Sequence, residues 1–396
     1  MRILWVKTEL LHPVDKGGRI RTYQMLRALA TEHEVTYLCL DDGGAAPDAP
    51  ERAAEYCTEL VTVPFRPTKK FQPGFFLDLA ANLFSSLPYA IARYRSEAQR
   101  TEVARRAAHA DLIVCDFLTP SQNVPSRLGA RTVLFQHNVE ASIWRRHASV
   151  ARDPLRRAYL RAQWRRMRRF EGEECRRFNR VIAVSEADAA TMRRDYGLDQ
   201  VGSVPTGVDL EYFVAPAHPS RQRTEILFVG SMDWMPNEEG IRWFVEQVFG
   251  RVRAQIPDAT LTIVGRAPSE KLRKLAERTE GMRLTGTVPD VRPHLARAGV
   301  CLVPLRVGGG TRIKIYEAMA MGVPVVSTTI GAEGLPVRHK EQLLIADTPE
   351  QQVDSIVRLM SDPQRAQRLA VDALAFVRQH GSWSAVATEF LKQCLS

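Results

Sequence analysis

The sequence predicts an α/β protein of two doubly wound, Rossmann-like domains that face each other across a cleft. Short apolar runs alternate with longer helical patterns along the 396 residues, which is typical of parallel sheets. The same strand–helix rhythm occurs on both sides of a polar, proline-containing stretch at residues 205–223. A chain of this length can also form two or three domains, each burying its own core.

The first half of the chain, residues 1–204, is expected to form the first domain. One helix is predicted from Ile20 to about Thr31, and an arginine-rich helix lies further along. The predicted strands are the short apolar runs "RILWV", "EVTYLCL", "DLIVC", "TVLFQ" and "VIAVS". Residues 205–223 are expected to link this domain to the next.

The second domain is expected at residues 224–378, with strands at "EILFVG", "TLTIVG", "MRLTG", "VCLVPL", "VPVVS" and "LLIA". Its helices are predicted to begin near Asn237, Pro268, Val291 and Thr311, and after Pro349 and Pro363. The remaining residues, 379–396, place apolar side chains on one helical side. We therefore expect this C-terminal helix to pack back on the first domain.

The composition is that of an ordinary globular protein, with 45% hydrophobic and 25% charged residues. No apolar run approaches the roughly 18 to 20 residues needed to cross a bilayer. The opening "MRILWVKTEL" suits a first strand better than a signal peptide. Six scattered cysteines without a C-x-x-C pair indicate reduced thiols, a cytoplasmic location, and neither a zinc site nor a disulfide framework.

Most of the net charge of +10 lies in one segment, Arg145–Arg180, which holds 13 Arg and no Lys against four acidic residues. Leu160, Trp164 and Met167 recur in it at helical spacing, so it is expected to form one long amphipathic helix. Its basic face is either simply solvated or docks on an anionic membrane surface. Nucleic acid is not expected as a partner, because no binding motif accompanies the charge.

Ligand sites on parallel sheets lie where strands end and helices begin. Glycines mark several such ends, where backbone N–H groups can approach a ligand closely: Gly17-Gly18, Gly230-Ser231, Gly265 and Gly308-Gly309-Gly310.

The stretch "PLRVGGGTRIKIYEAMAMGVPVV", residues 304–326, opens a helix with Arg312 and Lys314 at the end whose dipole repels cations. Either these side chains are solvated beside a flexible loop, or an anion sits at the helix start. Glycine amides, the helix end and two cations would converge on such an anion, as they do around phosphates. Glu317, one turn later, could then accept hydrogen bonds from ribose hydroxyls. The P-loop pattern, G-x-G-x-x-G and D-x-D are all absent.

Taken together, the motifs resemble the retaining GT-B fold glycosyltransferases of family 4, over almost the whole chain. The resemblance rests on "DKGGRIRTYQMLRALATEHEV", "QHNVE", "VIAVSEADAATM", "PTGVD", "FVGSMDWMPNEEGIRWF", "GTVPDVRPHLARA" and "GGGTRIKIYEAMAMGVPVVST". It implies a nucleotide-sugar donor bound mainly to the second domain and a glycan or lipid-linked acceptor bound to the first.

The resemblance also implies roles for individual residues. His137 matches a histidine that faces the reacting sugar, and Glu317 matches the second Glu of a Glu-x7-Glu motif, which holds the ribose. Val288 and Val291 would lie near the base. The other donor-binding residues on the second domain would be Gly230, Ser231, Gly265, Gly308, Gly309, Gly310, Thr311, Arg312 and Lys314. Gly17 and Gly18 would approach the diphosphate from the opposite wall, and Arg19, Asp116 and Asn138 would lie on the acceptor side.

Two departures from the family pattern stand out. Gly309 occupies the place of the first Glu of the motif, which makes this a glycine-rich variant. The Arg and Lys that many members carry after the first strand of the second domain are replaced by Ser231 and "MDWMPNEEG". We hypothesise that Arg312 and Lys314 supply the missing cations.

The expected reaction is transfer of a sugar with retention, without metal or other cofactor, in the synthesis of cell-envelope polysaccharide. Glycine amides, Arg312 and Lys314 would stabilise the leaving nucleoside diphosphate, whose oxygen could take the acceptor's proton. His137 would orient the sugar or acceptor, or else be a structural histidine at a strand end. The alternatives are a nucleotide-sugar epimerase or phosphorylase on the same scaffold, and a non-catalytic protein that binds membrane surfaces through Arg145–Arg180.

Overall fold

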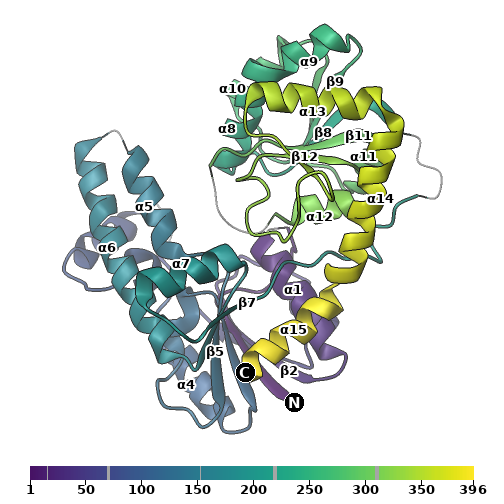
Figure 1. Ribbon diagram of the computed structural model, residues 1–396. Helices are drawn as coiled ribbons and strands as arrows, with labels where there is room; N and C mark the ends of the chain where they lie inside the picture. Colours follow the sequence, from purple (N-terminus) through teal and green to yellow (C-terminus); the bar gives the residue numbers. More distant parts are fainter. Residues whose placement is uncertain (16, 69–71, 152, 217–220, 308–311) are drawn as a thin grey trace. The chain divides into compact units, whose positions relative to one another are not determined.

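The computed structural model describes all residues except 16, 69–71, 152, 217–220 and 308–311 (Figure 1). It divides into two compact units. The first comprises Met1–Val204 with Val386–Ser396, and the second comprises Pro205–Ala385. This division places the expected linker, residues 205–223, at the start of the second unit.

The first unit contains a seven-stranded parallel sheet in the order β3-β2-β1-β4-β5-β6-β7. Its strands are β1 (Arg2–Lys7), β2 (Glu34–Asp41), β3 (Glu59–Pro64), β4 (Leu112–Asp116), β5 (Arg131–Gln136), β6 (Arg180–Ala183) and β7 (Val201–Ser203). The five central strands are buried on both faces, so they appear in the sequence as apolar runs. The two edge strands, β3 and β7, were not predicted, because β3 is half polar and β7 has only three residues.

The helices of the first unit are α1 (Gly17–Ala30), α2 (Pro73–Asn82), α3 (Tyr89–Ala92), α4 (Glu97–Ala107), α5 (Glu140–Val150), α6 (Pro154–Arg177) and α7 (Glu186–Tyr196). The prediction of one long arginine-rich helix is wrong, since the segment forms two helices, α5 and α6. Asp153 and Pro154 cause the break: the Asp153 carboxylate caps α6 at the backbone N–H of Arg156, 2.6 Å away, and Pro154 takes the first helical position.

Helix α15 (Trp383–Leu395) contributes its second half to the first unit. Phe390 is fully buried, and its ring lies 5.6 Å from that of Trp5 on β1 and 4.9 Å from that of Phe135 on β5. Leu4 and Val6, the neighbours of Trp5 in β1, belong instead to the core cluster that includes Met167 of α6. The sheet is therefore covered on both faces.

The second unit contains a six-stranded parallel sheet in the order β10-β9-β8-β11-β12-β13. Its strands are β8 (Gln222–Val229), β9 (Thr260–Val264), β10 (Met282–Gly286), β11 (Ala298–Val303), β12 (Val325–Ser327) and β13 (Leu344–Ile345). Its helices are α8 (Met235–Phe244), α9 (Gly250–Gln255), α10 (Glu270–Glu277), α11 (Arg292–Arg297), α12 (Ile313–Ala320), α13 (Pro349–Ser361) and α14 (Pro363–His380). A π-helical turn, Val245–Phe249, joins α8 to α9.

This sheet too carries a core on each face. Phe228 of β8 packs in a cluster with Phe244 of α8 and Ile356 of α13. The preceding residue, Leu227, points to the other face and packs in a second cluster with Ile315 of α12 and Val377 of α14. The predicted fold of two doubly wound α/β units is therefore confirmed.

In each sheet the strands are added first toward one edge and then toward the other. The switch lies between β1 and β4 in the first unit and between β8 and β11 in the second. At such a switch point the flanking helices lie on opposite faces and leave room for a ligand at the carboxyl ends of the strands. Each unit therefore has one such place for a ligand.

Candidate active site

In the second unit, the loop that follows β8 is bound to the loop that follows β9. The N–H of Gly230 donates to the carbonyl of Val264 at 2.9 Å, and the N–H of Met232 donates to the carbonyl of Arg266 at 2.9 Å. A Cβ on Gly265 would lie 1.8 Å from the Gly230 carbonyl oxygen, so only glycine fits there. The structure thus brings Gly230, Ser231 and Gly265 together, and their expected role in donor binding stays a prediction.

Lys314, in the first turn of α12, reaches this same loop. Its ammonium donates to Asn237 Oδ1 at 3.1 Å and lies 4.2 Å from the centre of the Phe228 ring. A Cβ on Gly230 would lie 2.6 Å from the Lys314 Nζ. The side chain of Lys314 therefore lies at the end of β8, next to the loop that contains Gly230.

The surroundings of Lys314 and Glu317 shift the pKa values of both groups toward neutrality. Burial, and then the nearby Arg312, lower the pKa of Lys314 to about 7. Burial raises the pKa of Glu317 to about 7, although Lys314 opposes that change. Ionisable groups with perturbed pKa values at a strand end are candidates for ligand binding or catalysis.

Arg312 immediately precedes α12 and is buried. Its Nη2 donates to the carbonyl oxygen of Ile330 at 3.3 Å, and its guanidinium lies 5.6 Å from the ring of Trp234, just before α8. Gly308, Gly309, Gly310 and Thr311 lie outside the described residues, so the expected role of their amides stays a prediction.

Val288 and Val291 are half-buried and pack against the cluster that contains Ile315 of α12. They belong to the same end of the sheet, because the N–H of Gly265 donates to the carbonyl of Gly286 at 3.1 Å. The sequence did not single out Arg266, whose Nε donates to Ser231 Oγ at 2.9 Å. A cation directly after the strand-ending Gly265 was the signal for it.

In the first unit, a buried cluster of charged and polar groups surrounds Asp116 at the end of β4. Asp116 Oδ2 accepts hydrogen bonds from Lys7 Nζ at 2.8 Å, Thr22 Oγ1 at 2.6 Å and Trp5 Nε1 at 3.0 Å. Burial alone would raise the pKa of Asp116, but Lys7 and then His137 lower it below the usual value. Asp116 is therefore a fixed anion.

His137, at the end of β5, contacts the other oxygen of this carboxylate. Its Nε2 lies 2.8 Å from Asp116 Oδ1, and its ring stacks on that of Phe117 with 3.9 Å between centroids. A Cβ on Gly18 would lie 2.8 Å from the Phe117 ring and 4.0 Å from His137 Nδ1. Burial lowers the pKa of His137 to about 4 despite Asp116, so the imidazole is neutral near pH 7.

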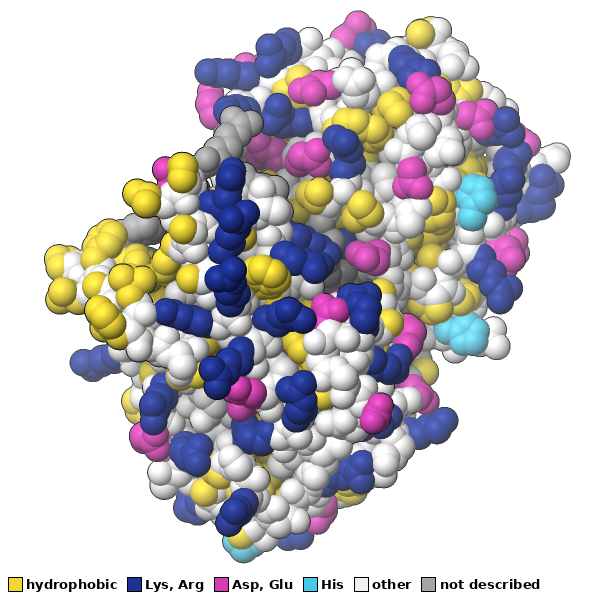
Figure 2. All heavy atoms as spheres, turned by 60° about the vertical axis from the view of Figure 1, so that its left-hand side comes forward, with side chains coloured by type: hydrophobic (Ala, Val, Ile, Leu, Met, Phe, Trp, Pro, Cys, Tyr) yellow, Lys and Arg dark blue, Asp and Glu magenta, His cyan; other side chains and the backbone are white. Residues whose placement is uncertain are grey.

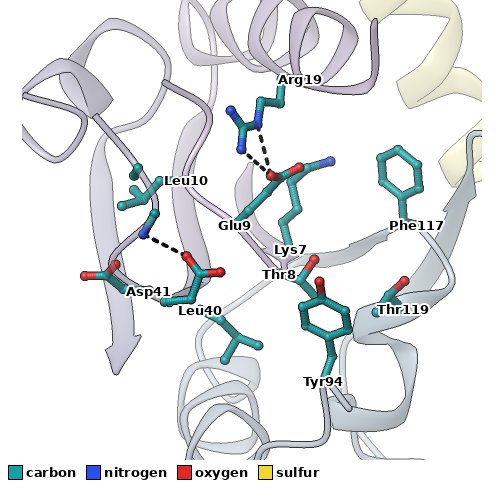
Figure 3. A pocket seen from close by; sticks show the side chains of 13 residues that line it. Lys7, Thr8, Glu9, Leu10, Arg19, Leu40, Asp41, Tyr94, Phe117 and Thr119 are labelled. Carbon is teal, nitrogen blue, oxygen red and sulfur yellow. Dashed lines mark hydrogen bonds and ion pairs between the residues drawn. The ribbon is translucent and has the colours of Figure 1, made fainter. Parts of the chain in front are cut away.

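The remaining first-unit predictions fall beside this cluster rather than in it. Arg19 forms an ion pair with Glu9 at 2.6 Å and lines a cavity of about 400 Å³ at the ends of β1 and β2, which Lys7 and Phe117 also line (Figure 3). Asn138 forms a hydrogen bond with Glu140, and a Cβ on Gly17 would meet no atom within 4 Å.

The sequence reasoning missed Lys7 and Thr22 as members of this cluster. Lys7 is 1% exposed at the end of β1, and Thr22 is fully buried in α1. The signal was a lysine at the end of an otherwise apolar strand, since a buried ammonium requires a carboxylate partner.

Two family models match the chain: Glycosyltransferase Family 4 over residues 16–212 and Glycosyl transferases group 1 over residues 223–362. An uncharacterized 44.6 kDa protein in the cps region of Klebsiella pneumoniae is 28% identical over 49% of this chain and 54% of its own length. A phosphatidyl-myo-inositol mannosyltransferase of Mycobacterium leprae is 30% identical over 53% and 57%. The chain thus spans about half the length of these relatives.

Among solved structures, Anabaena HepE in complex with UDP and glucose has the same fold, with a TM-score of 0.68 and 14% identity over 99% of this chain and 98% of that one. The fold is thus the GT-B fold. Since the two family models together match most of both units, the chain belongs to the family 4, group 1 glycosyltransferases.

Proposed function

We propose that this protein transfers a sugar, with retention and without a metal, from a nucleotide-diphosphate sugar to a hydroxyl of a glycan or lipid-linked acceptor. The observation that carries the proposal is the position of Lys314, whose ammonium lies against Asn237 and Gly230 at the end of β8. This is a place for an anionic group, at the switch point of the second sheet.

On the donor side, the leaving group is a nucleoside diphosphate whose negative charge grows as the sugar departs. Lys314, Arg312 and the start of α12 would stabilise that charge, as preorganised cations and amides do in other enzymes. Glu317 would accept hydrogen bonds from the ribose. The UDP and glucose complex of the Anabaena protein supports this assignment by its fold.

On the acceptor side, we place the acceptor hydroxyl near the first-unit cluster. A neutral His137 beside Asp116 would orient the sugar or the acceptor through hydrogen bonds rather than as a cation. The cavity that Arg19 lines would take the rest of the acceptor. A leaving phosphate oxygen would receive the acceptor's proton, so no side-chain base is required.

The names of the relatives favour a role in the cell envelope. One is encoded in a cps region and another mannosylates phosphatidyl-myo-inositol. We therefore propose cell-envelope polysaccharide or glycolipid synthesis at the inner face of the plasma membrane. Among the described residues, no helix is both long and apolar enough to cross a membrane.

Thermal melting against a panel of nucleoside diphosphates tests the donor assignment, because a ligand of the folded state raises stability by mass action. We expect one diphosphate to raise the melting temperature of the wild type and to have little effect on Lys314→Met. An equal shift in both proteins would overturn the assignment of Lys314.

The preferred nucleotide sugar is then tested in transfer to candidate acceptors, with and without EDTA. Retention is checked by the anomeric proton couplings of the product. Donor epimerisation without an acceptor, or activity that EDTA abolishes and Mg²⁺ restores, would contradict the proposed reaction.

A further inference from the structure

Helix α2 of the first unit and the two residues that follow it carry four large exposed apolar side chains, which we call the α2 tip. Phe76 is 56% exposed, Leu77 71%, Leu83 56% and Phe84 95%. Single exposed hydrophobic residues are common on protein surfaces, but a contiguous group of large ones marks an interaction site. Figure 2 shows such a group of hydrophobic side chains at one edge of the molecule.

Hydrogen bonds hold this tip against α6. Gln163 Nε2 of α6 donates to Asn82 Oδ1 at 3.1 Å. Arg166 donates from its two terminal nitrogens to the carbonyl oxygens of Asn82 and Leu83, both at 2.7 Å. The apolar tip is thus presented in a defined position beside the arginine-rich helix.

The outer side of α6 is strongly basic. Arg161, Arg165 and Arg168 are exposed, and their spacing of four and three residues places them along one side of the helix. None of the three has a carboxylate partner within the part of the chain that the structure describes. Figure 2 shows Lys and Arg side chains in a column next to the apolar group.

A groove of about 510 Å³ lies between α6 and α7, and Arg165, Arg168 and Arg169 line it. Its two acidic lining residues are already paired, Glu173 with Arg169 and Asp195 with Arg194, each at 2.8 Å. The charge that remains in the groove is therefore positive, and it is suited to the phosphate of a lipid headgroup.

We propose that the α2 tip and the exposed arginines of α6 form a docking surface for an anionic phospholipid membrane. The apolar side chains would enter the acyl boundary while the arginines contact headgroup phosphates, as in interfacial helices. A symmetric pairing of two copies through this surface would bring the like-charged arginines together, and a soluble polyanion would leave the apolar tip without a role. The surface does not depend on the proposed transfer reaction.

Vesicle binding of the full chain tests this surface. We expect binding to phosphatidylcholine vesicles that contain phosphatidylglycerol, and weak binding to phosphatidylcholine alone. Replacing Arg161, Arg165 and Arg168 by Gln should weaken binding about a hundredfold, since each arginine near an anionic surface contributes about fivefold. The matched control replaces three exposed arginines of the second unit: Arg273, Arg278 and Arg368.

Phe84→Ser distinguishes a membrane from a soluble polyanion. It should weaken vesicle binding about tenfold and leave binding to heparin unchanged. The control is Val371→Ser, at a side chain that is 51% exposed, and it should change neither kind of binding. Unaltered vesicle binding by Phe84→Ser would overturn the proposal, as would a wild-type dimer that Phe84→Ser converts to a monomer. Nucleoside diphosphate binding should be normal in every variant, so failure here is separable from failure of the proposed function.

Discussion

The affinity for a nucleotide sugar should fall as the pH rises above 7, because Lys314 loses its proton in that range. Burial and Arg312 lower the pKa of Lys314 to about 7 in the free protein. A nucleotide sugar carries a diphosphate diester whose charge does not change near neutral pH, so its binding reports the charge of the protein. A bound diphosphate would hold the ammonium protonated and raise its pKa.

The size of the effect follows from the fraction of protein in the charged form. About half of the free protein carries the charged ammonium at pH 7 and about 3% does at pH 8.5, so the apparent affinity should fall about fifteenfold. Lys314→Arg keeps the charge at both pH values, since a guanidinium does not titrate in this range. Its affinity should therefore change less with pH than that of the wild type, with the remaining dependence coming from Glu317, whose pKa burial raises to about 7.

Isothermal titration calorimetry measures both quantities. Titrations at pH 8 in buffers of different ionisation enthalpy should show uptake of about one proton per ligand at Lys314 in the wild type. Lys314→Arg should lose that proton uptake and keep only the smaller contribution of Glu317. Lys274→Arg, at an exposed lysine of α10 that pairs with Glu270, is the matched control and should behave as wild type. A wild-type affinity independent of pH, or an unchanged slope in Lys314→Arg, would refute the placement of the diphosphate at Lys314.

Three other substitutions test separate parts of the molecule. Gly230→Ala places a Cβ 2.6 Å from Lys314 Nζ and 2.8 Å from Asn237 Nδ2, so it should weaken nucleotide-sugar binding at least tenfold with a normal circular dichroism spectrum; unchanged calorimetric affinity would contradict this. Asp116→Asn removes the charge beside Lys7 and should lower stability by about 3 to 5 kcal/mol in urea unfolding, because it leaves a buried ammonium unpaired; a loss below 1 kcal/mol would show that the pair is not needed. Phe390→Ala should cost about 3 to 5 kcal/mol and leave nucleotide affinity intact, whereas equal stability would mean that α15 does not pack as described.

The sequence was sufficient for the fold because its central strands are buried on both faces. Such strands appear as apolar runs, and the alternation with helices then implies parallel order. The edge strand β3, Glu59–Pro64, has polar residues and one buried side, and it carried no comparable signal. The break at Asp153-Pro154 had a clear signal, an N-cap followed by proline, which the continuous arginine pattern concealed.

The site was predictable only where a motif marks it. Glycines at strand ends led to Gly230 and Gly265, and a dipole argument led to Lys314. Asp116 was expected on the acceptor side, but its bonds to Lys7 and Thr22 join residues 109 and 94 positions apart in the chain. The lysine at the end of β1 signals that a carboxylate partner is needed, but no local pattern identifies that partner, because the sheet order brings the ends of β1 and β4 together.

The two cations at the start of α12, Arg312 and Lys314, carry an energetic cost in the free protein. In solvent, a cation in the first turn of a helix costs only about 0.3 to 1 kcal/mol. Arg312, however, is 3% exposed, and the pKa of Lys314 has fallen to about 7, so neither side chain has the full hydration that would make the arrangement inexpensive. Burial adds a desolvation penalty to the unfavourable dipole, and two such cations within three residues repel each other as well. An anionic ligand at this helix start would offset all three costs by its attraction for the cations and the helix end, and that is the physical reason to place the diphosphate there.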